Sequence, residues 1–427
     1  MMRHLNLTEG EPARPFQLSA DEAEALAAAE LATVSRAPGS SSWDVAAGRR
    51  VGVARVGNLQ VVVRPKISIE RLVFLMGYAQ KPQFWRDAPV LLDPEADLAS
   101  ALADSFVRRT RKALEQGLLH GYVEISDALP LVRGRIRVGD QIARRHGTLL
   151  PVEVTYDEFS VDVAENQILL AAVLRLLSVP TLSPPIRQGL RRTRLQLADV
   201  SPAVRGQLLP TWRPTRLNTR YQPALVLAEL ILAGDSFEQR VGDLHISGFV
   251  FDMWKIYEVF VCVALREAMK SYGGRVSLQR QMHFDEGSRV DMKPDLYWAS
   301  DDGRHLVIDA KYKAEKPSGF PNADLYQLLA YCTVLGLEEG HLVYAEGNED
   351  AVSHTVVGSG VRIHCHTLNL ACPPAALLER VRGLACHIAG GARSTGRKAH
   401  REQASNARGS WRAERQTSAI ARKTVTR

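Results

Sequence analysis

Short runs of alternating apolar and polar residues dominate the first part of the chain. Residues 50–56 and 59–66 are two such runs, and the Gly57-Asn58 pair between them is typical of a tight hairpin turn. Residues 21–34 are rich in alanine, with an acidic first turn that predicts a helix. We therefore expect residues 1–97 to form a β-rich domain with an inserted helix.

The pattern changes to helical spacing further on, with apolar residues recurring every three or four positions. This spacing predicts helices over residues 69–78, 98–119, 164–178, 185–198 and 224–232. Residues 124–159 alternate instead and predict β-structure. The arginines of this region fall in clusters, so we expect residues 98–235 to form a basic region of mixed helices and strands, with these candidate nucleic-acid contacts: Arg133, Arg135, Arg137, Arg191 and Arg192.

A third pattern begins near residue 236. A long apolar helix is predicted over residues 249–271, where Gly273-Gly274 follows. Three strands, a helix and a fourth strand come next, at residues 276–284, 295–298, 305–310, 323–335 and 341–345. This α-β-β-β-α-β order favours a mixed sheet flanked by helices over residues 236–388. Residues 389–427 hold few large apolar side chains and predict a disordered basic tail.

The predicted elements favour a multidomain α+β/α/β protein, and a length of 427 residues allows two or three domains. Contents of 45% hydrophobic and 24% charged residues are ordinary for soluble globular proteins. The net charge of +7 is unevenly spread: residues 101–220 carry +7, residues 221–390 carry −7, and residues 391–427 carry +8. Attraction for a polyanion should therefore come from the middle region or the tail.

The chain has no apolar run long enough to span a membrane and no secretory signal at its start, so we expect a cytoplasmic protein. Its five cysteines show no C-x-x-C spacing, which disfavours a disulfide framework or a zinc site. The His364-Cys365-His366 triplet alternates along a predicted strand and is a weak candidate for metal binding.

The strongest chemical signal is a Pro294-Asp295 pair on one predicted strand and Asp309-Ala310-Lys311 on the next. Residues two apart on a strand share a face, so Asp309 and Lys311 should lie together, and a neighbouring strand could add Asp295. Two carboxylates and a backbone carbonyl, that of Ala310, suit Mg²⁺ and leave room for a phosphate and water. Lys311, with a lowered pKa, could orient or deprotonate that water.

Other interpretations of these residues remain open. Asp309 could instead be a structural carboxylate paired with Lys311 or Lys313, and Asp291 competes with Asp295. Glu258 and Gln327 are further catalytic candidates from the flanking helices, with Tyr331 supporting Gln327 and Lys313 as a secondary phosphate contact. No P-loop, H-E-x-x-H or G-x-S-x-G motif is present.

These residues resemble the PD-(D/E)xK nuclease superfamily, and more closely the McrC family of McrBC 5-methylcytosine restriction systems. The resemblance follows this order along the chain: residues 51–67, Phe159 to Leu170, Met253 to Glu258, Lys293 to Lys313, and Tyr326-Gln327 with Tyr331. It covers most of the chain apart from the basic tail.

The resemblance implies a Mg²⁺-dependent DNA endonuclease subunit whose catalytic residues are Asp295, Asp309 and Lys311. An AAA+ GTPase partner would read the modified base and move double-stranded DNA. This chain would dock on the partner through its N-terminal β-rich domain, residues 1–97, and stimulate GTP hydrolysis. Two alternatives stay open: an adaptor that activates a ring NTPase without cutting, and a repair nuclease that needs no GTPase.

Overall fold

A computed structural model describes residues 2–36, 42–85, 97–179, 181–203, 209–241, 244–314, 322–346 and 352–390. The chain divides into two compact units, Met1–Met253 and Trp254–Arg427, called here the N-terminal and C-terminal units. In the described parts of the chain, no helix is long and apolar enough to cross a membrane. The expected tail, residues 389–427, lies almost wholly outside the described residues.

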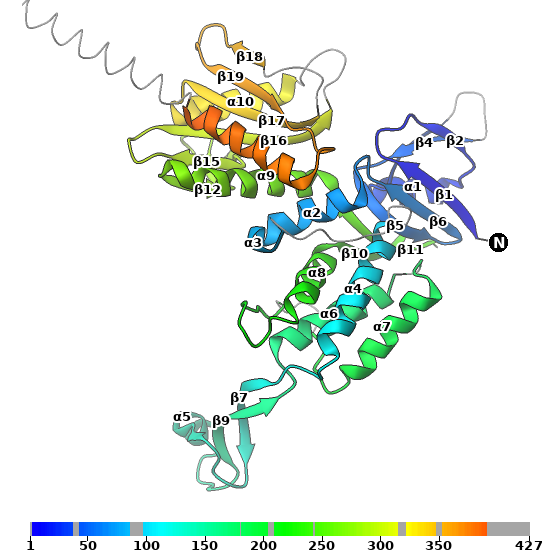
Figure 1. Ribbon diagram of the computed structural model, residues 1–427, viewed down its shortest axis with the longest axis vertical. Coiled ribbons are helices and arrows are strands. Elements are labelled where there is room, and N and C mark those ends of the chain that lie inside the picture. The colour runs from blue at the N-terminus through cyan, green and yellow to red at the C-terminus, as the bar shows by residue number, and fades with distance from the viewer. Residues whose placement is uncertain are drawn as a thin grey trace, which may run out of the picture. The chain divides into compact units, whose positions relative to one another are not determined.

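A five-stranded sheet forms the first part of the N-terminal unit, in the order β1-β6-β5-β11-β10 (Figure 1). Its strands are β1 (Arg3–Thr8), β5 (Arg50–Val56), β6 (Leu59–Arg64), β10 (Asp235–Val241) and β11 (Leu244–Asp252). The predicted β5–β6 hairpin is confirmed, because Val56 pairs with Leu59 across the turn. Gly52 has φ 137°, and a Cβ there would lie 2.3 Å from the Phe249 carbonyl oxygen. Glycine at this position lets β5 and β11 approach each other.

A smaller sheet accompanies it in the order β2-β4-β3, made of β2 (Arg14–Phe16), β3 (Ala32–Arg36) and β4 (Trp43–Ala47). Helix α1 (Ala20–Ala28) begins with a capping box between Ser19 and Glu22. The predicted helix over residues 21–34 was therefore too long. It ends at Ala28 because the next residues pair with β4 as strand β3.

Most helices of the N-terminal unit agree with their predicted positions: α2 (Ile69–Gln80), α4 (Leu98–Leu114), α6 (Ala164–Leu177), α7 (Pro184–Gln196) and α8 (Gln222–Ala233), with the short α3 (Pro82–Trp85) after α2. Helix α6 packs against α7 and α8, and α4 packs against the same two helices. Their apolar faces form a buried core, which includes Leu169, Leu190 and Leu227.

An extension from this helical core holds β7 (Gly121–Leu129), β8 (Arg135–Ile136), α5 (Val138–Arg144) and β9 (Val152–Ser160) (Figure 1). Its sheet order is β7-β9-β8, so the predicted β-structure of residues 124–159 is confirmed except for α5. Several large apolar side chains of the extension are exposed, among them Leu149 at 89% and Tyr122 at 77%.

The C-terminal unit is built on a six-stranded sheet of order β12-β15-β16-β17-β19-β18. The strands are β12 (Arg275–Leu278), β15 (Leu296–Ala299), β16 (His305–Ala314), β17 (Glu339–Glu346), β18 (Val352–Thr355) and β19 (Arg362–Thr367). Helices α9 (Met253–Met269) and α10 (Asn322–Leu335), the 3₁₀ turn η1 (Lys270–Tyr272) and a helix over residues 374–390 accompany it. The β12, β15 and β16 pairings are antiparallel, whereas β16 pairs with β17 in parallel.

The α-β-β-β-α-β order expected for this unit is present as α9, β12, β15, β16, α10 and β17. Two details differ. The predicted strand over residues 276–284 is split into β12 and a two-stranded hairpin, β13 (Met282–His283) with β14 (Asp291–Met292). The predicted helix over residues 249–271 starts only at Met253, because residues 249–252 belong to β11.

The division of the chain also falls later than expected. The sequence predicts a boundary between residues 97 and 98 and another between residues 235 and 236, whereas the two compact units divide after Met253. Strands β10 and β11 instead complete the sheet of β5, and helices α4 to α8 belong to the same unit as that sheet. One unit therefore spans both regions expected before residue 236, together with the β10–β11 hairpin.

Candidate active site

Two adjacent strands of the C-terminal unit bring the predicted acidic residues together. Asp295 immediately precedes β15, and Asp309, Ala310 and Lys311 lie in β16. Leu296 pairs with Ile308, so Asp295 falls beside Asp309 in the antiparallel register. All three charged side chains are buried, with exposed fractions of 6% for Asp295, 2% for Asp309 and 6% for Lys311. Charged groups so deeply buried require partners.

The Asp295 carboxylate is held from two sides. Its Oδ2 accepts a hydrogen bond from the Ala310 backbone N–H over 2.9 Å. Its Oδ1 accepts one from the Gln279 side-chain Nε2 over 2.7 Å. Both donors are neutral amides, so they orient the carboxylate without cancelling its charge.

Asp309 carries the most perturbed carboxyl group of the site. Burial, and then the negative charge of Asp295 beside it, raise its pKa from the usual range to about 7 against the opposing effect of Lys311. Its Oδ2 lies 2.6 Å from the Lys311 Nζ in a close ion pair. Because two buried carboxylates this close repel each other, the pair should favour a cation that both can contact.

Hydrogen bonds link Lys311 to two side chains of helix α10. Its Nζ donates to the Oε1 of Gln327 over 3.0 Å, and the Gln327 Nε2 in turn donates to the Tyr331 hydroxyl over 2.7 Å. Burial lowers the pKa of Lys311, but Asp309, Asp295 and Asp324 outweigh it and raise the pKa. The lowered pKa that the sequence predicts for Lys311 is therefore wrong. In the protein without metal, the pKa of Lys311 is raised and its side chain is protonated.

Helix α9 contributes the acidic candidate Glu258, which is half-buried. Cys262 lies one helical turn further along α9, and its pKa is raised well above the usual value by burial, and then by Asp295, Asp309 and Glu258. Residues four apart lie on one face of a helix, so Glu258 shares the face of α9 that carries the buried Cys262.

Two polar residues near the site were not found from the sequence. Asp324, in the first turn of α10, is 4% exposed, contributes to the raised pKa of Lys311 and accepts a hydrogen bond from the Tyr344 hydroxyl over 3.3 Å. Gln279, which directly follows β12, is the other. The sequence position of Asp324 gives no signal of a role at the site, because an acidic residue suits the first turn of any helix.

The residues of the pair fit a magnesium ion by their chemistry. Mg²⁺ takes oxygen ligands and keeps several waters. In the described part of the chain, no group of three or more histidine, cysteine or acidic side chains is arranged to hold a metal. A magnesium site would therefore rest on Asp295 and Asp309, the Ala310 carbonyl and water. Burial, and then the charge of Asp295, raise the pKa of Asp309, and a bound cation would favour its ionised form.

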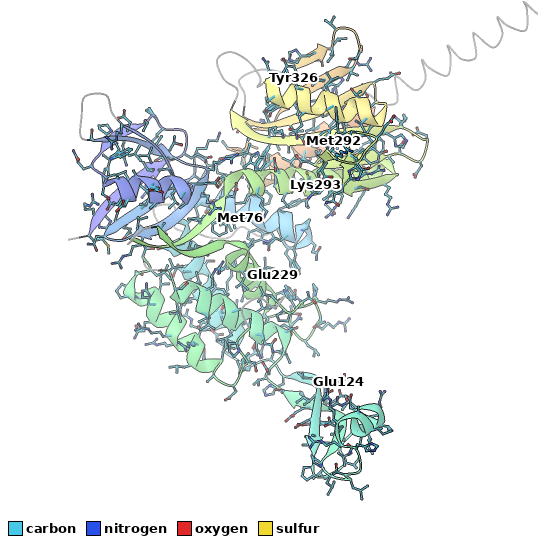
Figure 2. The ribbon with its side chains drawn as sticks, turned by 180° about the vertical axis from the view of Figure 1, so that it is seen from behind. Met76, Glu124, Glu229, Met292, Lys293 and Tyr326 are labelled. Carbon is cyan, nitrogen blue, oxygen red and sulfur yellow. The ribbon has the colours of Figure 1, made fainter. Side chains whose placement is uncertain are left out.

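Asp291, the competitor for the role of Asp295, lies elsewhere. Its side chain is 90% exposed, and it pairs with His283 across the β13–β14 hairpin at 3.2 Å. It lines a cavity of about 490 Å³ together with Met292, Lys293, Gln327 and Tyr331. Figure 2 labels Met292 and Lys293 on this wall. The cavity therefore borders the Lys311–Gln327–Tyr331 chain.

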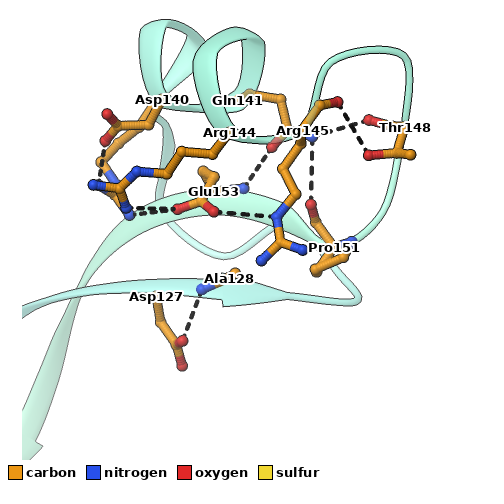
Figure 3. A network of polar contacts seen from close by, with 10 residues as sticks. Asp127, Ala128, Asp140, Gln141, Arg144, Arg145, Thr148, Pro151 and Glu153 are labelled. Atoms are coloured by element: carbon orange, nitrogen blue, oxygen red, sulfur yellow. Dashed lines mark hydrogen bonds and ion pairs between the residues drawn. The ribbon is translucent and has the colours of Figure 1, made fainter.

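The arginines predicted on one face of the extension have different surroundings. Arg135 is exposed, and the Arg133 guanidinium lies 4.0 Å from the ring centre of Tyr156. Arg137 is instead held inside the extension by ion pairs with Asp140 and Glu153. Figure 3 shows the buried Glu153 carboxylate among these basic side chains, with Arg145 at 3.3 Å and Arg144 at 3.8 Å. Arg137 thus stabilises the extension.

Helix α7 carries Arg191 and Arg192, which are both exposed. Arg191 and Arg194 border a mostly apolar cavity of about 620 Å³ between α6 and α7. Lys313 belongs to β16, but its side chain lies outside the described residues.

The His364-Cys365-His366 triplet belongs to a stack of imidazoles rather than to the acidic pair. His341 and His366 are buried, and the His341 Nδ1 lies 3.1 Å from the His366 Nε2. Burial lowers the pKa of His366 to about 4 and that of His341 well below its usual value. Both imidazoles are therefore neutral near pH 7.

Comparisons with known proteins agree with the resemblance. A family model described as a McrBC 5-methylcytosine restriction system component matches residues 45–345. No curated protein matches the chain. A chain from the refined half-complex of Thermococcus gammatolerans McrB AAA+ hexamers with bound McrC is similar in fold, with 16% identity and a TM-score of 0.51 over 88% of this chain and 99% of that chain. A chain of the Thermococcus gammatolerans McrBC complex is 20% identical, with a TM-score of 0.37 over 62% of this chain and 88% of that chain.

Proposed function

The chain belongs to the family of McrBC 5-methylcytosine restriction system components, and on this premise we propose that it is the Mg²⁺-dependent DNA endonuclease subunit of such a system. One observation carries the proposal: Asp295, Asp309 and Lys311 meet as buried charges on two adjacent strands. The α9-β12-β15-β16-α10-β17 order is that expected of a PD-(D/E)xK nuclease core.

The reaction is hydrolysis of a phosphodiester bond. Asp295, Asp309 and the Ala310 carbonyl would hold Mg²⁺, which supplies Lewis-acid polarisation of the phosphate and a more acidic bound water. A water oxygen forms a bond to phosphorus, the bond from phosphorus to the leaving oxygen breaks, and the water proton passes to solvent or to the leaving oxygen.

Lys311 contributes as a cation. As an ammonium it would donate hydrogen bonds to the attacking water or to a phosphate oxygen and offset negative charge in the transition state. Gln327 fixes the direction of the Lys311 Nζ through its 3.0 Å hydrogen bond. The cavity beside Gln327 and Tyr331 gives the nucleotide next to the cut phosphate a place to lie.

The proposed partner is an AAA+ GTPase. The sequence holds no nucleotide-binding motif of its own, so the energy for moving DNA must come from another protein. The extension formed by β7, β8, α5 and β9 exposes large apolar side chains beside arginines, as a docking surface does. In the Thermococcus gammatolerans assembly with a similar fold, McrC is bound to McrB AAA+ hexamers. Modified-base recognition would belong to that partner.

The test uses the full chain with its GTPase partner, GTP, Mg²⁺ and plasmid DNA methylated at cytosine. We expect Asp309→Asn and Lys311→Ala to reduce cleavage by at least about a thousandfold while stimulation of GTP hydrolysis remains. Glu379→Gln, at an exposed carboxylate of the same unit, is the matched control. Undiminished cleavage by the two variants would refute the assignment of the site.

The same experiment separates the alternatives. A wild-type chain that stimulates GTP hydrolysis but never cuts DNA would be an adaptor. A wild-type chain that cuts at full rate without the GTPase would be a stand-alone nuclease.

A further inference from the structure

Strand β12 ends beside the acidic pair in an unusual backbone conformation. Its last residue is Leu278, which pairs with Leu296 of β15. The next residue, Gln279, has φ 52°, in the left-handed region that non-glycine residues seldom occupy. Non-glycine residues persist there where surrounding contacts hold them, and such positions gather at functional sites.

The contacts that hold Gln279 both end on one residue. Its backbone N–H donates to the Asp295 carbonyl oxygen over 2.9 Å, and its side-chain Nε2 donates to Asp295 Oδ1 over 2.7 Å. The left-handed turn therefore lets one residue bind the backbone and the carboxylate of Asp295 at the same time. The Ala310 N–H on Oδ2 is the backbone hydrogen bond that the neighbouring strand gives to the same carboxylate.

We propose that Gln279 is a positioning residue that fixes the Asp295 carboxylate for a divalent cation. The inference rests on the proposed function, because it assigns a role within the same metal site. A carboxylate pinned at both oxygens keeps further lone pairs on each oxygen for the metal, and it does not need to reorient when the metal binds. The hydrogen bond from Gln279 also holds the Asp295 carboxylate beside Asp309, although the two negative charges repel each other.

The chain offers variants that separate the side chain from the backbone turn. Gln279→Gly removes the amide but adopts φ 52° freely, so the turn survives. Ser288→Gly is the matched control, because Ser288 also has φ 52° and lies in the loop of the β13–β14 hairpin.

The first measurement is metal binding without DNA, by calorimetric titration of the full chain with Mn²⁺ and with Mg²⁺. We expect Gln279→Gly to weaken binding about 10- to 100-fold, as loss of a residue that orients a metal ligand does. Ser288→Gly should bind the metal as the wild type does. The second measurement is cleavage with the GTPase partner over a range of Mg²⁺ concentrations. There the Gln279→Gly midpoint should shift to higher Mg²⁺, with the rate largely restored at saturation.

The outcomes distinguish this inference from the proposed function. Unchanged metal affinity and an unchanged Mg²⁺ midpoint in Gln279→Gly, with Asp309→Asn losing both binding and cleavage, would overturn the role of Gln279 alone. A rate loss that no Mg²⁺ concentration restores, with normal metal affinity, would also overturn it. Retained metal binding and cleavage in Asp309→Asn would instead overturn the metal site itself.

Discussion

The Nζ of Lys311 donates a hydrogen bond to the Oε1 of Gln327 over 3.0 Å, which links strand β16 to helix α10. Removing the acceptor by Gln327→Ala leaves a buried ammonium with one fewer partner. A hydrogen bond to a charged group contributes about 1.5–3 kcal/mol, so cleavage should fall about 10- to 100-fold. Initial rates of DNA cleavage with the GTPase partner measure this.

Tyr331→Phe tests the next bond of the same chain, since the Tyr331 hydroxyl accepts from Gln327. The loss should stay below about tenfold, because only a neutral hydrogen bond disappears. Tyr326→Phe is the control, at a tyrosine that is 67% exposed on the same helix. Equal effects of Tyr326→Phe and Tyr331→Phe would contradict an ordered polar chain.

Asp309→Asn should stabilise the metal-free protein. The pKa of Asp309 is raised to about 7 by burial and by Asp295, so at pH 8 the folded protein holds a carboxylate that it disfavours. A neutral amide of the same shape removes this repulsion, and the free energy of unfolding of the C-terminal unit should rise by about 1–3 kcal/mol. Denaturant unfolding in EDTA at pH 8 measures the change.

The stabilising effect should reverse when Mg²⁺ is added. The wild type should gain stability with increasing Mg²⁺, whereas Asp309→Asn should not. A variant less stable than the wild type in EDTA would show that the ion pair with Lys311 outweighs the repulsion by Asp295.

Glu153→Ala should loosen the extension formed by β7, β8, α5 and β9. The Glu153 carboxylate is buried among Arg137, Arg144 and Arg145, and its removal leaves these arginines without their shared partner. Local destabilisation of about 2–4 kcal/mol follows. Amide hydrogen exchange in residues 121–160 should accelerate, while exchange in the C-terminal unit stays constant.

The control for this change is Glu124→Ala, an exposed carboxylate on β7. If the extension docks on the GTPase, Glu153→Ala should also weaken stimulation of GTP hydrolysis, and Glu124→Ala should not. Full stimulation by a chain with a loosened extension would place the docking surface elsewhere.

His366 should reduce the stability of the C-terminal unit as the pH is lowered from 6.5 to 4, against the gain from Asp309, whose folded-state pKa is raised. Burial holds the folded-state pKa of His366 at about 4, below its usual 6.5, so the unfolded chain binds more protons in this range. The contribution is present above pH 6.5, and about 3 kcal/mol is lost by pH 4. His341, whose pKa is also lowered, acts in the same direction.

Other groups around His366 shape this profile. Glu339, paired with Arg362 and His364, has a pKa lowered to about 2, so its loss of stability comes below pH 4.5. The imidazoles of His364 and His387 also contact His366. The stability of His366→Gln relative to the wild type should therefore rise as the pH falls from 6.5 to 4, as measured by denaturant unfolding of both proteins at each pH. Parallel pH profiles of the wild type and His366→Gln would assign the pH dependence to the other groups.

The core of the candidate site was readable from sequence because each residue follows a strong local pattern. Asp309 and Lys311 interrupt an apolar strand two residues apart, which predicts a shared face whatever the strand pairs with. Gln327 was suggested by helical spacing with Tyr331, and the structure joins the two by a hydrogen bond. The catalytic roles of these residues stay predictions.

Features set by long-range pairing could not be predicted. Nothing local indicates that Gln279 reaches Asp295, because the contact depends on a left-handed turn and on the β12–β15 register. The apolar residues 249–251 suit a helix or a strand equally, and their pairing with β5 makes them part of a strand. The pKa of Lys311 was misjudged because burial alone lowers it, while Asp324 and the acidic pair raise it.

The direct passage from β11 to α9 has a practical consequence for dissecting the protein. Strand β11 ends at Asp252 and α9 begins at Met253, so no spacer separates the last strand of one unit from the first helix of the other. A fragment beginning near residue 254 would expose the start of α9 without its preceding strand, only one turn before Glu258. Catalysis and partner binding are therefore better separated by point substitutions in the intact chain than by truncation.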